Sequence, residues 1–311
     1  MTGHTLLVLN NPAARHLALL DRLPQETRIV AGETAEAFVR AAPEADTLLV
    51  GAVPRALVEE VLAMAPNVKW VHTMWAGLDT LLFPALVENE RGVVLTNGRG
   101  VFSRSLAEFA ITGMLWFAKD VRRMRRQQRE GKWEKFTVTE LHGQTLGVVG
   151  HGSIGRATAA LAVAFGMQVR AVGRGHTPLE LGELLEHSDY VLVSTPLTDS
   201  TRGLIGEAEL RRMKAGAVLL NLGRGPVVVE EALIRALREG WIRGAVLDVY
   251  DQEPLPEGHA LWGLENVLLS PHCADNTASW LDEAMEFYVE NFERYTRGEE
   301  LKNIVDMRQG Y

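Results

Sequence analysis

The stretch Thr145-Leu-Gly-Val-Val-Gly-His-Gly-Ser-Ile-Gly155 decides the fold. Its first five residues form a short apolar run of the kind found in buried parallel strands. The residues from Ser153 to Phe165 then have the apolar spacing of a helix. A G-x-G-x-x-G pattern is weak evidence alone, but between a strand and a helix it is typical of a dinucleotide-binding turn.

Each glycine of this turn has a physical reason to be glycine. Gly150 permits the tight turn, Gly152 lets the backbone approach a pyrophosphate, and Gly155 lets the helix pack closely on the strand. The helix N-terminus, at Ser153 and Ile154, is expected to face the anion. The competing interpretation is a glycine-rich turn that binds no ligand.

Strand-like apolar runs alternate with helical patterns on both sides of the turn, which predicts parallel α/β sheets. In the second half of the chain the expected strands are Leu146–Val149, Gln168–Val172, Tyr190–Thr195, Ala217–Asn221, Gly244–Asp248 and Val267–Ser270, with a helix at Glu230–Glu239. In the first third we expect strands at Thr5–Leu9, Thr47–Val50, Lys69–Thr73 and Val93–Thr96, with helices at Thr34–Ala42 and Arg55–Ala65.

Between the two halves the sequence predicts one long helix, from about Ser105 to Glu130. Ser105 and Glu108 have capping-box spacing, and Gly131 is a suitable stop. The expected apolar stripe is Leu106, Ala110, Gly113, Met114, Phe117, Val121 and Met124. Such a helix crosses between domains or lies in a subunit interface; the alternative is a long core helix.

Composition narrows the class of protein. The 311 residues suggest about two domains, and 47% hydrophobic with 23% charged residues is ordinary for a globular protein. A net charge of −8 argues against nucleic-acid binding through overall charge. Accordingly, the arginines of the long helix are interpreted as its solvated or interface end.

The single cysteine, Cys273, cannot form an intramolecular disulfide and fits a reducing compartment. Histidines and cysteines lack metal-ligand spacing, so no metal is expected. The longest apolar runs are far shorter than the roughly 20 residues that span a bilayer. We therefore expect a cytoplasmic protein with neither a membrane nor a nucleic acid as partner.

The residues after the second strand of the dinucleotide unit, Gly173-Arg-Gly-His-Thr177, bear on the choice of cofactor. An acidic residue is expected there, about 20 residues after the glycine turn, to bind a ribose hydroxyl. Gly173 occupies the position and Arg174 follows, so a 2′-phosphate is not repelled and can pair with the guanidinium. We predict NADP(H) in preference to NAD(H), with hydrogen bonds from His176 and Thr177. The alternative is that Arg174 stacks on adenine or is solvated, and NAD(H) is used.

Three chemically informative side chains each follow an expected strand: Arg224, Glu253 and His272. An arginine offers a planar fork that matches a carboxylate, and a histidine can give or take a proton near neutral pH. A carboxylate beside His272 would orient the ring and stabilise its charged form. Together these groups suit the reduction of a carbonyl beside a carboxylate.

On these motifs the sequence resembles the D-isomer-specific 2-hydroxyacid dehydrogenase family over essentially the whole chain. The matching stretches are 146–155, 196–205, 221–225, 247–256 and 270–272. The resemblance implies that Arg224, Glu253 and His272 are catalytic. It implies reduction of a 2-oxo acid, glyoxylate-like or hydroxypyruvate-like, to the D-2-hydroxy acid by NAD(P)H.

The resemblance also assigns binding residues. Asp248 would hold the nicotinamide carboxamide, and Thr195 and Pro196 would line the adenine side. The stretch Trp75-Ala76-Gly77-Leu-Asp79 resembles the loop whose backbone N–H groups receive the substrate carboxylate.

The fold implied is α/β with two domains, usually in a homodimer. A Rossmann-type doubly wound parallel sheet is expected in residues 99–274, and a flavodoxin-like substrate domain in residues 1–98 and 275–311. The segment Ala274–Tyr311 starts with a helix and has no strands of its own, so we expect it to pack on the first domain.

Several positions depart from the family pattern. Trp75 is bulkier than expected and is predicted to narrow the substrate pocket, whose shape Arg99, Phe102 and Trp280 also set. Cys273, Asp275 and Asn276 replace small or apolar residues, and their role stays open. The sequence does not identify the acid. The alternative function is a dinucleotide-sensing, corepressor-like interaction protein with the same fold.

Overall fold

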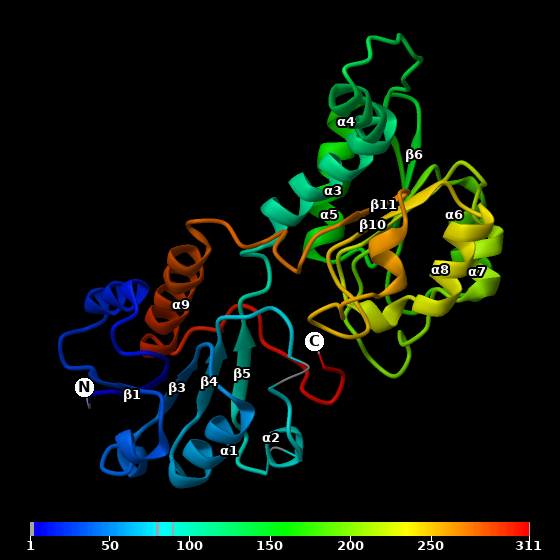
Figure 1. The fold of residues 1–311 in the computed structure, drawn as a ribbon. Helices are drawn as coiled ribbons and strands as arrows, with labels where there is room; N and C mark the ends of the chain where they lie inside the picture. Colours follow the sequence, from blue (N-terminus) through cyan, green and yellow to red (C-terminus); the bar gives the residue numbers. More distant parts are fainter. Residues whose placement is uncertain (1–2, 79–80, 89, 311) are drawn as a thin grey trace. The chain divides into compact units, whose positions relative to one another are not determined.

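Buried apolar strands form two parallel sheets in the computed structural model, which describes residues 3–78, 81–88 and 90–310 (Figure 1). The chain divides into two units, Met1–Phe102 with Thr277–Tyr311, and Ser103–Asn276. They are called here the first and the second unit. The division into domains at residues 98/99 and 274/275, with one domain for each ligand, stays a prediction.

The sheet of the first unit has the strand order β2-β1-β3-β4-β5. Its strands are β1 (Thr5–Leu9), β2 (Arg28–Gly32), β3 (Thr47–Val50), β4 (Trp70–Thr73) and β5 (Val94–Asn97). Four of the five were predicted. β2 was not predicted, because it is an edge strand whose first two residues are exposed and it lacks the apolar run by which the others are recognised. The order is that of a flavodoxin-like sheet.

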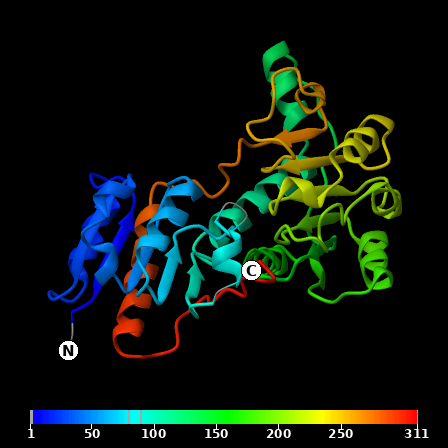
Figure 2. The same cartoon turned by 90° about the horizontal axis from the view of Figure 1, so that it is seen from below.

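Helices cover both faces of this sheet, and one of these helices comes from the last segment of the chain. α9 (Trp280–Thr296) buries Ala284, Met285, Tyr288 and Phe292 against residues of β1, β3 and β4. Figure 2 shows α9 beside the N-terminal strands, as the sequence predicted. The other helices are α1 (Arg55–Met64), the short α2 (Pro84–Glu88) and the 3-10 helix η1 (Arg15–Arg22).

The helix predicted at Thr34–Ala42 is wrong. The connection from β2 to β3 contains only short 3-10 turns, at Ala35–Ala37 and Ala42–Glu44. Phe38, Ala41 and Ala42 are buried, so the apolar spacing correctly reported the inward face. Bonds such as Phe38 N–H to Ala35 C=O close tighter turns, which are common in short connections.

The second unit has six parallel strands in the order β11-β10-β9-β8-β6-β7, a Rossmann-type doubly wound sheet. The strands are β6 (Thr145–Val149), β7 (Gln168–Val172), β8 (Tyr190–Val193), β9 (Val218–Asn221), β10 (Gly244–Leu247) and β11 (Val267–Leu269). All six were predicted within two residues at each end. The intervening helices are α5 (Ser153–Ala164), α6 (Pro178–His187), α7 (Glu207–Arg212) and α8 (Glu230–Glu239).

The single long helix predicted from Ser105 to Glu130 is wrong, because two helices occupy this stretch: α3 (Ser103–Ala118) and α4 (Val121–Glu130). Asp120 breaks them apart with a left-handed backbone (φ 49°), and its side chain caps α4 by accepting the Arg123 N–H at 3.3 Å. Gly131 ends α4 as predicted, also left-handed.

The prediction of a capping box at Ser105 is wrong as well. The helix begins two residues earlier, and the Ser105 hydroxyl donates to the Ala274 carbonyl at 2.5 Å. The apolar stripe is buried only as far as Phe117, because α4 has no buried residue. Over the described residues, no helix is both long and apolar enough to cross a membrane.

Candidate active site

The glycine turn lies where the chain order reverses in the second sheet, between β6 and β8. Gly150 has φ 101°, and a Cβ there would lie 2.8 Å from the Thr195 nitrogen. A Cβ at Gly155 would lie 2.4 Å from the Gly150 carbonyl oxygen, whereas one at Gly152 would meet nothing within 4 Å. The turn is therefore tight, closely packed and open at the position where a pyrophosphate would approach.

The start of α5 is electrostatically suited to an anion. Its first turn carries no acidic residue, and no side chain caps it. Its N–H groups are thus available to a phosphate, and the helix dipole favours negative charge there. The neighbouring loop is joined to the turn, because the Ser194 hydroxyl donates to the Gly150 carbonyl at 2.8 Å.

At the end of β7, a Cβ on Gly173 would also meet nothing within 4 Å. The loop that carries Arg174 turns at Gly175 (φ 76°). His176 Nδ1 donates to the Gly173 carbonyl at 2.8 Å. The Thr177 hydroxyl belongs to a capping box with Glu180 at the start of α6. Thr177 therefore has a structural role, as the N-cap of α6, that its sequence context did not predict.

The loops that leave β9, β10 and β11 carry Arg224, Glu253 and His272, all at the carboxyl edge of one parallel sheet. The structure brings the last two into contact: His272 Nδ1 donates to Glu253 Oε2 at 2.6 Å. The other carboxylate oxygen, Oε1, accepts the Tyr250 N–H at 3.0 Å. Because Nδ1 carries a hydrogen here, Nε2 is the atom through which His272 can exchange a proton with a ligand.

The Arg224 loop is held against the Glu253 loop by backbone contact. A Cβ at the next residue, Gly225, would lie 1.9 Å from the Tyr250 carbonyl oxygen and 2.5 Å from the Asp251 nitrogen. Only glycine allows this approach, which explains the Gly-Arg-Gly sequence. Arg224 is half-buried, and its Nη1 donates to the Gly223 carbonyl at 2.8 Å.

Asp248 holds the loop that carries His272. It is 2% exposed, and its Oδ1 accepts the Ser270 hydroxyl at 2.6 Å, the Cys273 N–H at 3.0 Å and the Ala274 N–H at 3.1 Å. These bonds fix His272 between them in a left-handed conformation (φ 51°). The sequence assigned Asp248 to the cofactor and missed this positioning role.

A second set of contacts, which the sequence did not predict, holds the Glu253 loop. Glu230, the first residue of α8, accepts the Asp251 N–H at 3.4 Å through Oε2. Its Oε1 lies 3.1 Å from Nε2 of His259, whose Nδ1 accepts the Leu261 N–H. An acidic residue at a helix start is ordinary, so the sequence held no signal of this contact.

Asp275 also belongs to the electrostatic surroundings of His272. Partial burial and the negative charge of Asp248 raise the pKa of Asp275, while the positive charges of His272 and Arg224 oppose the rise. Cys273 is exposed, with its sulfur 3.4 Å from the Ser270 hydroxyl. Asp275 therefore takes up a proton more readily than an exposed aspartate.

The loop Trp75–Gly77 leaves β4 in the first unit. The Trp75 N–H is accepted by the Thr73 hydroxyl at 3.3 Å, and the Ala76 carbonyl accepts from Asn97 Nδ2 at 2.9 Å. Over the described residues, no acceptor is found for the N–H groups of Ala76 and Gly77. The loop thus offers two neighbouring donors; Asp79 of the same motif lies outside the described residues.

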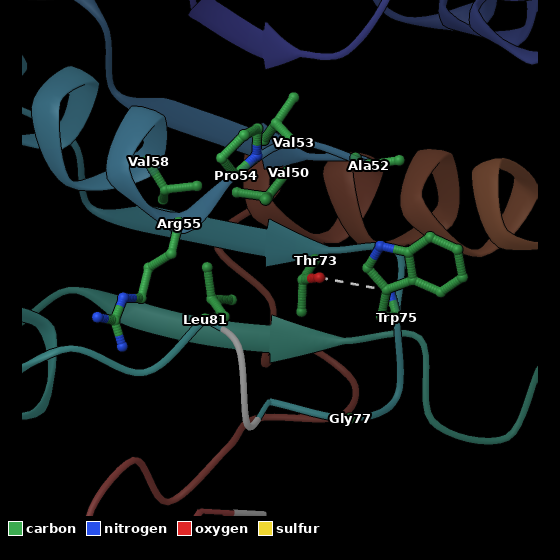
Figure 3. Close-up of a pocket in the computed structure, with 11 residues that line it drawn as sticks. Val50, Ala52, Val53, Pro54, Arg55, Val58, Thr73, Trp75, Gly77 and Leu81 are labelled. Atoms are coloured by element: carbon green, nitrogen blue, oxygen red, sulfur yellow. Dashed lines mark hydrogen bonds between the residues drawn. The ribbon is translucent and has the colours of Figure 1, made fainter. Parts of the chain in front are cut away.

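A pocket of about 210 Å³ adjoins this loop (Figure 3). Trp75 is 39% exposed, and its ring packs on Trp280, with 4.8 Å between centroids. Trp280 in turn packs on Phe102 at 5.6 Å. The aromatic residues that the sequence named as shaping the pocket therefore form one cluster. Of these aromatic residues and Arg99, only Trp75 is among the described residues that line this pocket.

Comparison with known proteins decides the family. The profile described as "D-isomer specific 2-hydroxyacid dehydrogenase, NAD binding domain" matches residues 111–274. A glyoxylate reductase from Korarchaeum cryptofilum is 38% identical over 265 residues, 79% of each chain. The chain belongs to the D-isomer-specific 2-hydroxyacid dehydrogenase family.

Solved structures agree with this assignment. A family member from Xanthobacter autotrophicus Py2, in complex with NADPH and MES, is 32% identical with a TM-score of 0.83, and all of both chains is covered. One from Aeromonas salmonicida is 30% identical with a TM-score of 0.82, covering 98% of this chain and 99% of that one. This dehydrogenase is an oxidoreductase that reduces a 2-oxo acid to the D-2-hydroxy acid with NAD(H) or NADP(H). Nothing in these comparisons supports the corepressor-like alternative.

Proposed function

We propose that this dehydrogenase reduces a 2-oxo acid of the glyoxylate or hydroxypyruvate type, and that Arg224, Glu253 and His272 are its catalytic residues. The observation that carries the proposal is the 2.6 Å contact between His272 and Glu253, at the sheet edge that also presents Arg224 and the glycine turn. The relatives named glyoxylate reductase support this substrate class.

In the proposed mechanism Arg224 binds the substrate carboxylate and polarises the neighbouring carbonyl. The assignment of Trp75, Ala76 and Gly77 to the substrate carboxylate, which the family resemblance implies, stays a prediction. When bound, the nicotinamide cofactor supplies the hydride. His272 protonates the carbonyl oxygen from Nε2 as negative charge develops on it, and Glu253 stabilises the imidazolium before the transfer.

We further propose that the cofactor lies along Gly150, Gly152, Ser153, Ile154 and Gly155, since the open space at Gly152 and the acid-free start of α5 fit a pyrophosphate. Thr195 and Pro196 would line the adenine side. Asp248 would contact the carboxamide through Oδ2, because Oδ1 already accepts three hydrogen bonds.

NADP(H) is the proposed preferred cofactor, with Arg174 paired to the 2′-phosphate. Gly173 leaves the ribose side open and supplies no carboxylate. The relative from Xanthobacter that was solved with NADPH supports the preference. Replacement of Arg174 by Ala should raise KM for NADPH by about tenfold or more, as expected for one charge-assisted pair, and leave KM for NADH nearly unchanged.

A homodimer is the proposed assembly, in the cytoplasm. Support comes from α4, which buries nothing within its own chain, and from the segment after it, where Trp133 is 94% exposed and Val138 41%. Figure 1 shows this segment standing away from the rest of the second unit. Light scattering should give twice the chain mass, and Trp133→Asp should shift the protein toward the monomer.

The decisive experiment is turnover of a panel of 2-oxo acids by the purified protein, followed by the absorbance of the reduced nicotinamide, with NADPH and with NADH. Consumption of cofactor that requires a 2-oxo acid, and is faster with NADPH at low concentration, is the expected result. Cofactor binding without turnover on any acid would contradict the proposal and favour a sensing role.

A further inference from the structure

Asp275 follows His272 by three residues, at a position where the family pattern has a small or apolar residue. We propose that Asp275 is a specificity-determining residue of the reaction: its carboxylate, close to the charges of Arg224 and His272, disfavours 2-oxo acids that carry a second carboxylate. This inference rests on the proposed function and specifies it, because it names monocarboxylic 2-oxo acids as the substrate class.

The backbone at Asp275 is fixed from two sides, both within the second unit. Asp275 lies in a tight turn, which the N–H of the next residue closes on the Cys273 carbonyl at 3.1 Å. Ala274, just before it, donates its N–H to Asp248 Oδ1 at 3.1 Å, and its carbonyl accepts the Ser105 hydroxyl at 2.5 Å. Because Asp248 follows β10 and Ser105 lies on α3, the turn is held by both the sheet and a helix.

The carboxyl group of Asp275 is half-buried and interacts electrostatically with three charges of the site. Burial and the negative charge of Asp248 raise its pKa, whereas the positive charges of His272 and Arg224 oppose the rise. Asp275 is therefore within electrostatic range of both groups that the proposed mechanism places on the substrate. An anion held by Arg224 and His272 is within range of Asp275 as well.

The negative charge of Asp275 is not cancelled by a cation in contact with it, because its side chain forms no ion pair in the part of the chain that the structure describes. The loops after β9, β10 and β11 (residues 222–229, 248–259 and 270–276) contain one arginine and no lysine, against five aspartates and glutamates. That arginine, Arg224, is taken by the first carboxylate of the substrate in the proposed mechanism. A second carboxylate would therefore meet an excess of acidic groups in these loops.

The expected size of the effect follows from Coulomb's law. Two like charges about 10 Å apart weaken binding roughly tenfold at the effective dielectric constant of about 20 that applies near a protein surface. The first carboxylate gains a direct, two-pronged contact with Arg224, which outweighs this repulsion. A second carboxylate experiences the repulsion alone. We therefore expect the wild-type protein to prefer 2-oxobutanoate to oxaloacetate, which has the same number of carbon atoms and one more carboxylate.

The test is kcat/KM for oxaloacetate and for 2-oxobutanoate at saturating NADPH, at about pH 8, far above the ordinary pKa of an aspartate. Asp275→Asn removes the charge and keeps the size of the side chain, so the ratio of oxaloacetate to 2-oxobutanoate should rise about tenfold. Both acids are measured on the same sample, so the ratio does not depend on how much of the variant is folded. Asp275→Ser also removes the charge and should act alike.

Two control variants separate charge from shape. Asp275→Glu keeps the charge and should leave the ratio within about twofold of the wild type. Glu183→Gln removes one charge from the exposed side of α6 and should leave the ratio unchanged. The inhibition constants of oxalate, with two negative charges, and oxamate, with one, report binding without turnover. Asp275→Asn should strengthen inhibition by oxalate about tenfold more than inhibition by oxamate.

An unchanged substrate ratio in both Asp275→Asn and Asp275→Ser would overturn this inference and leave the proposed function intact. An equal rise in Glu183→Gln would do the same, because the effect would then come from net charge and not from Asp275. A wild-type protein that prefers oxaloacetate would also contradict it. Failure of the wild type on every 2-oxo acid would instead overturn the proposed function, and this inference with it.

Discussion

At His272 the backbone adopts a conformation that few residues other than glycine occupy. Three hydrogen bonds to Asp248 from the adjoining residues hold it there. The ring is thereby directed to Glu253, whose second oxygen is itself fixed by the Tyr250 N–H. Strain at this residue is balanced by its neighbours, which is typical of groups that must keep one orientation.

This geometry predicts the effect of removing the proton donor. His272→Gln should lower kcat by at least about 10²-fold, because general acid catalysis usually contributes that much. Affinity for NADPH, measured by fluorescence titration, should change little, since the imidazole serves the substrate. Near-normal turnover by this variant would remove His272 from the mechanism.

Among the elements, the loops after β9, β10 and β11 act as one joined structure. Gly225 packs on the Tyr250–Asp251 peptide, and the Tyr250 hydroxyl lies 2.7 Å from the Ser270 carbonyl oxygen. Burial raises the pKa of Tyr250 to about 12, so the hydroxyl keeps its proton at any working pH. The three loops are thus joined by contacts that do not involve the side chains of Arg224, Glu253 or His272.

Glu230 contacts the loop that carries Glu253 from the start of α8. Its removal should make the position of the Glu253 side chain less fixed. Glu230→Ala frees the Asp251 N–H and His259, and should lower kcat about tenfold while KM for NADPH stays constant. Because Glu253 contacts His272, the loss should appear in kcat and in the solvent isotope effect on the proton transfer. Glu231→Ala is the matched control, since Glu231 is adjacent and exposed. Lost stability with an unchanged kcat and isotope effect would reduce Glu230 to a structural residue.

The elements also show what the sequence could predict. Strands buried on both faces, such as β6 and β9, were predicted because apolar runs report burial directly. The break at Asp120 was missed because the same apolar spacing continues through Val121 and Met124, whose burial depends on neighbours that α4 lacks. The contact between Glu253 and His272 was predicted from their places after strands. Glu230 and His259 were not, because their contact joins residues far apart in sequence.

For the whole molecule, the core of the first unit makes stability depend on pH. His72, on β4, is fully buried beneath α9, where its ring lies 5.3 Å from that of Tyr288. Its Nδ1 lies 2.7 Å from the Thr96 hydroxyl, which also accepts a hydrogen bond from Trp70 Nε1. Burial lowers the pKa of His72 from 6.5 to about 3.

The folded protein therefore keeps His72 neutral where the unfolded chain binds a proton. Its contribution to stability is complete above about pH 6.5 and is lost as the pH falls toward 3. The loss is at most about 1.4 kcal/mol per pH unit, or about 2 kcal/mol between pH 6.5 and pH 5. His72→Phe keeps the ring but cannot titrate, so urea unfolding at about pH 8 and about pH 5 should show a smaller loss for the variant than for the wild type. Both proteins share the same carboxylates, which makes their difference a measure of His72 alone. Equal losses would mean that His72 does not control the acid sensitivity of this core.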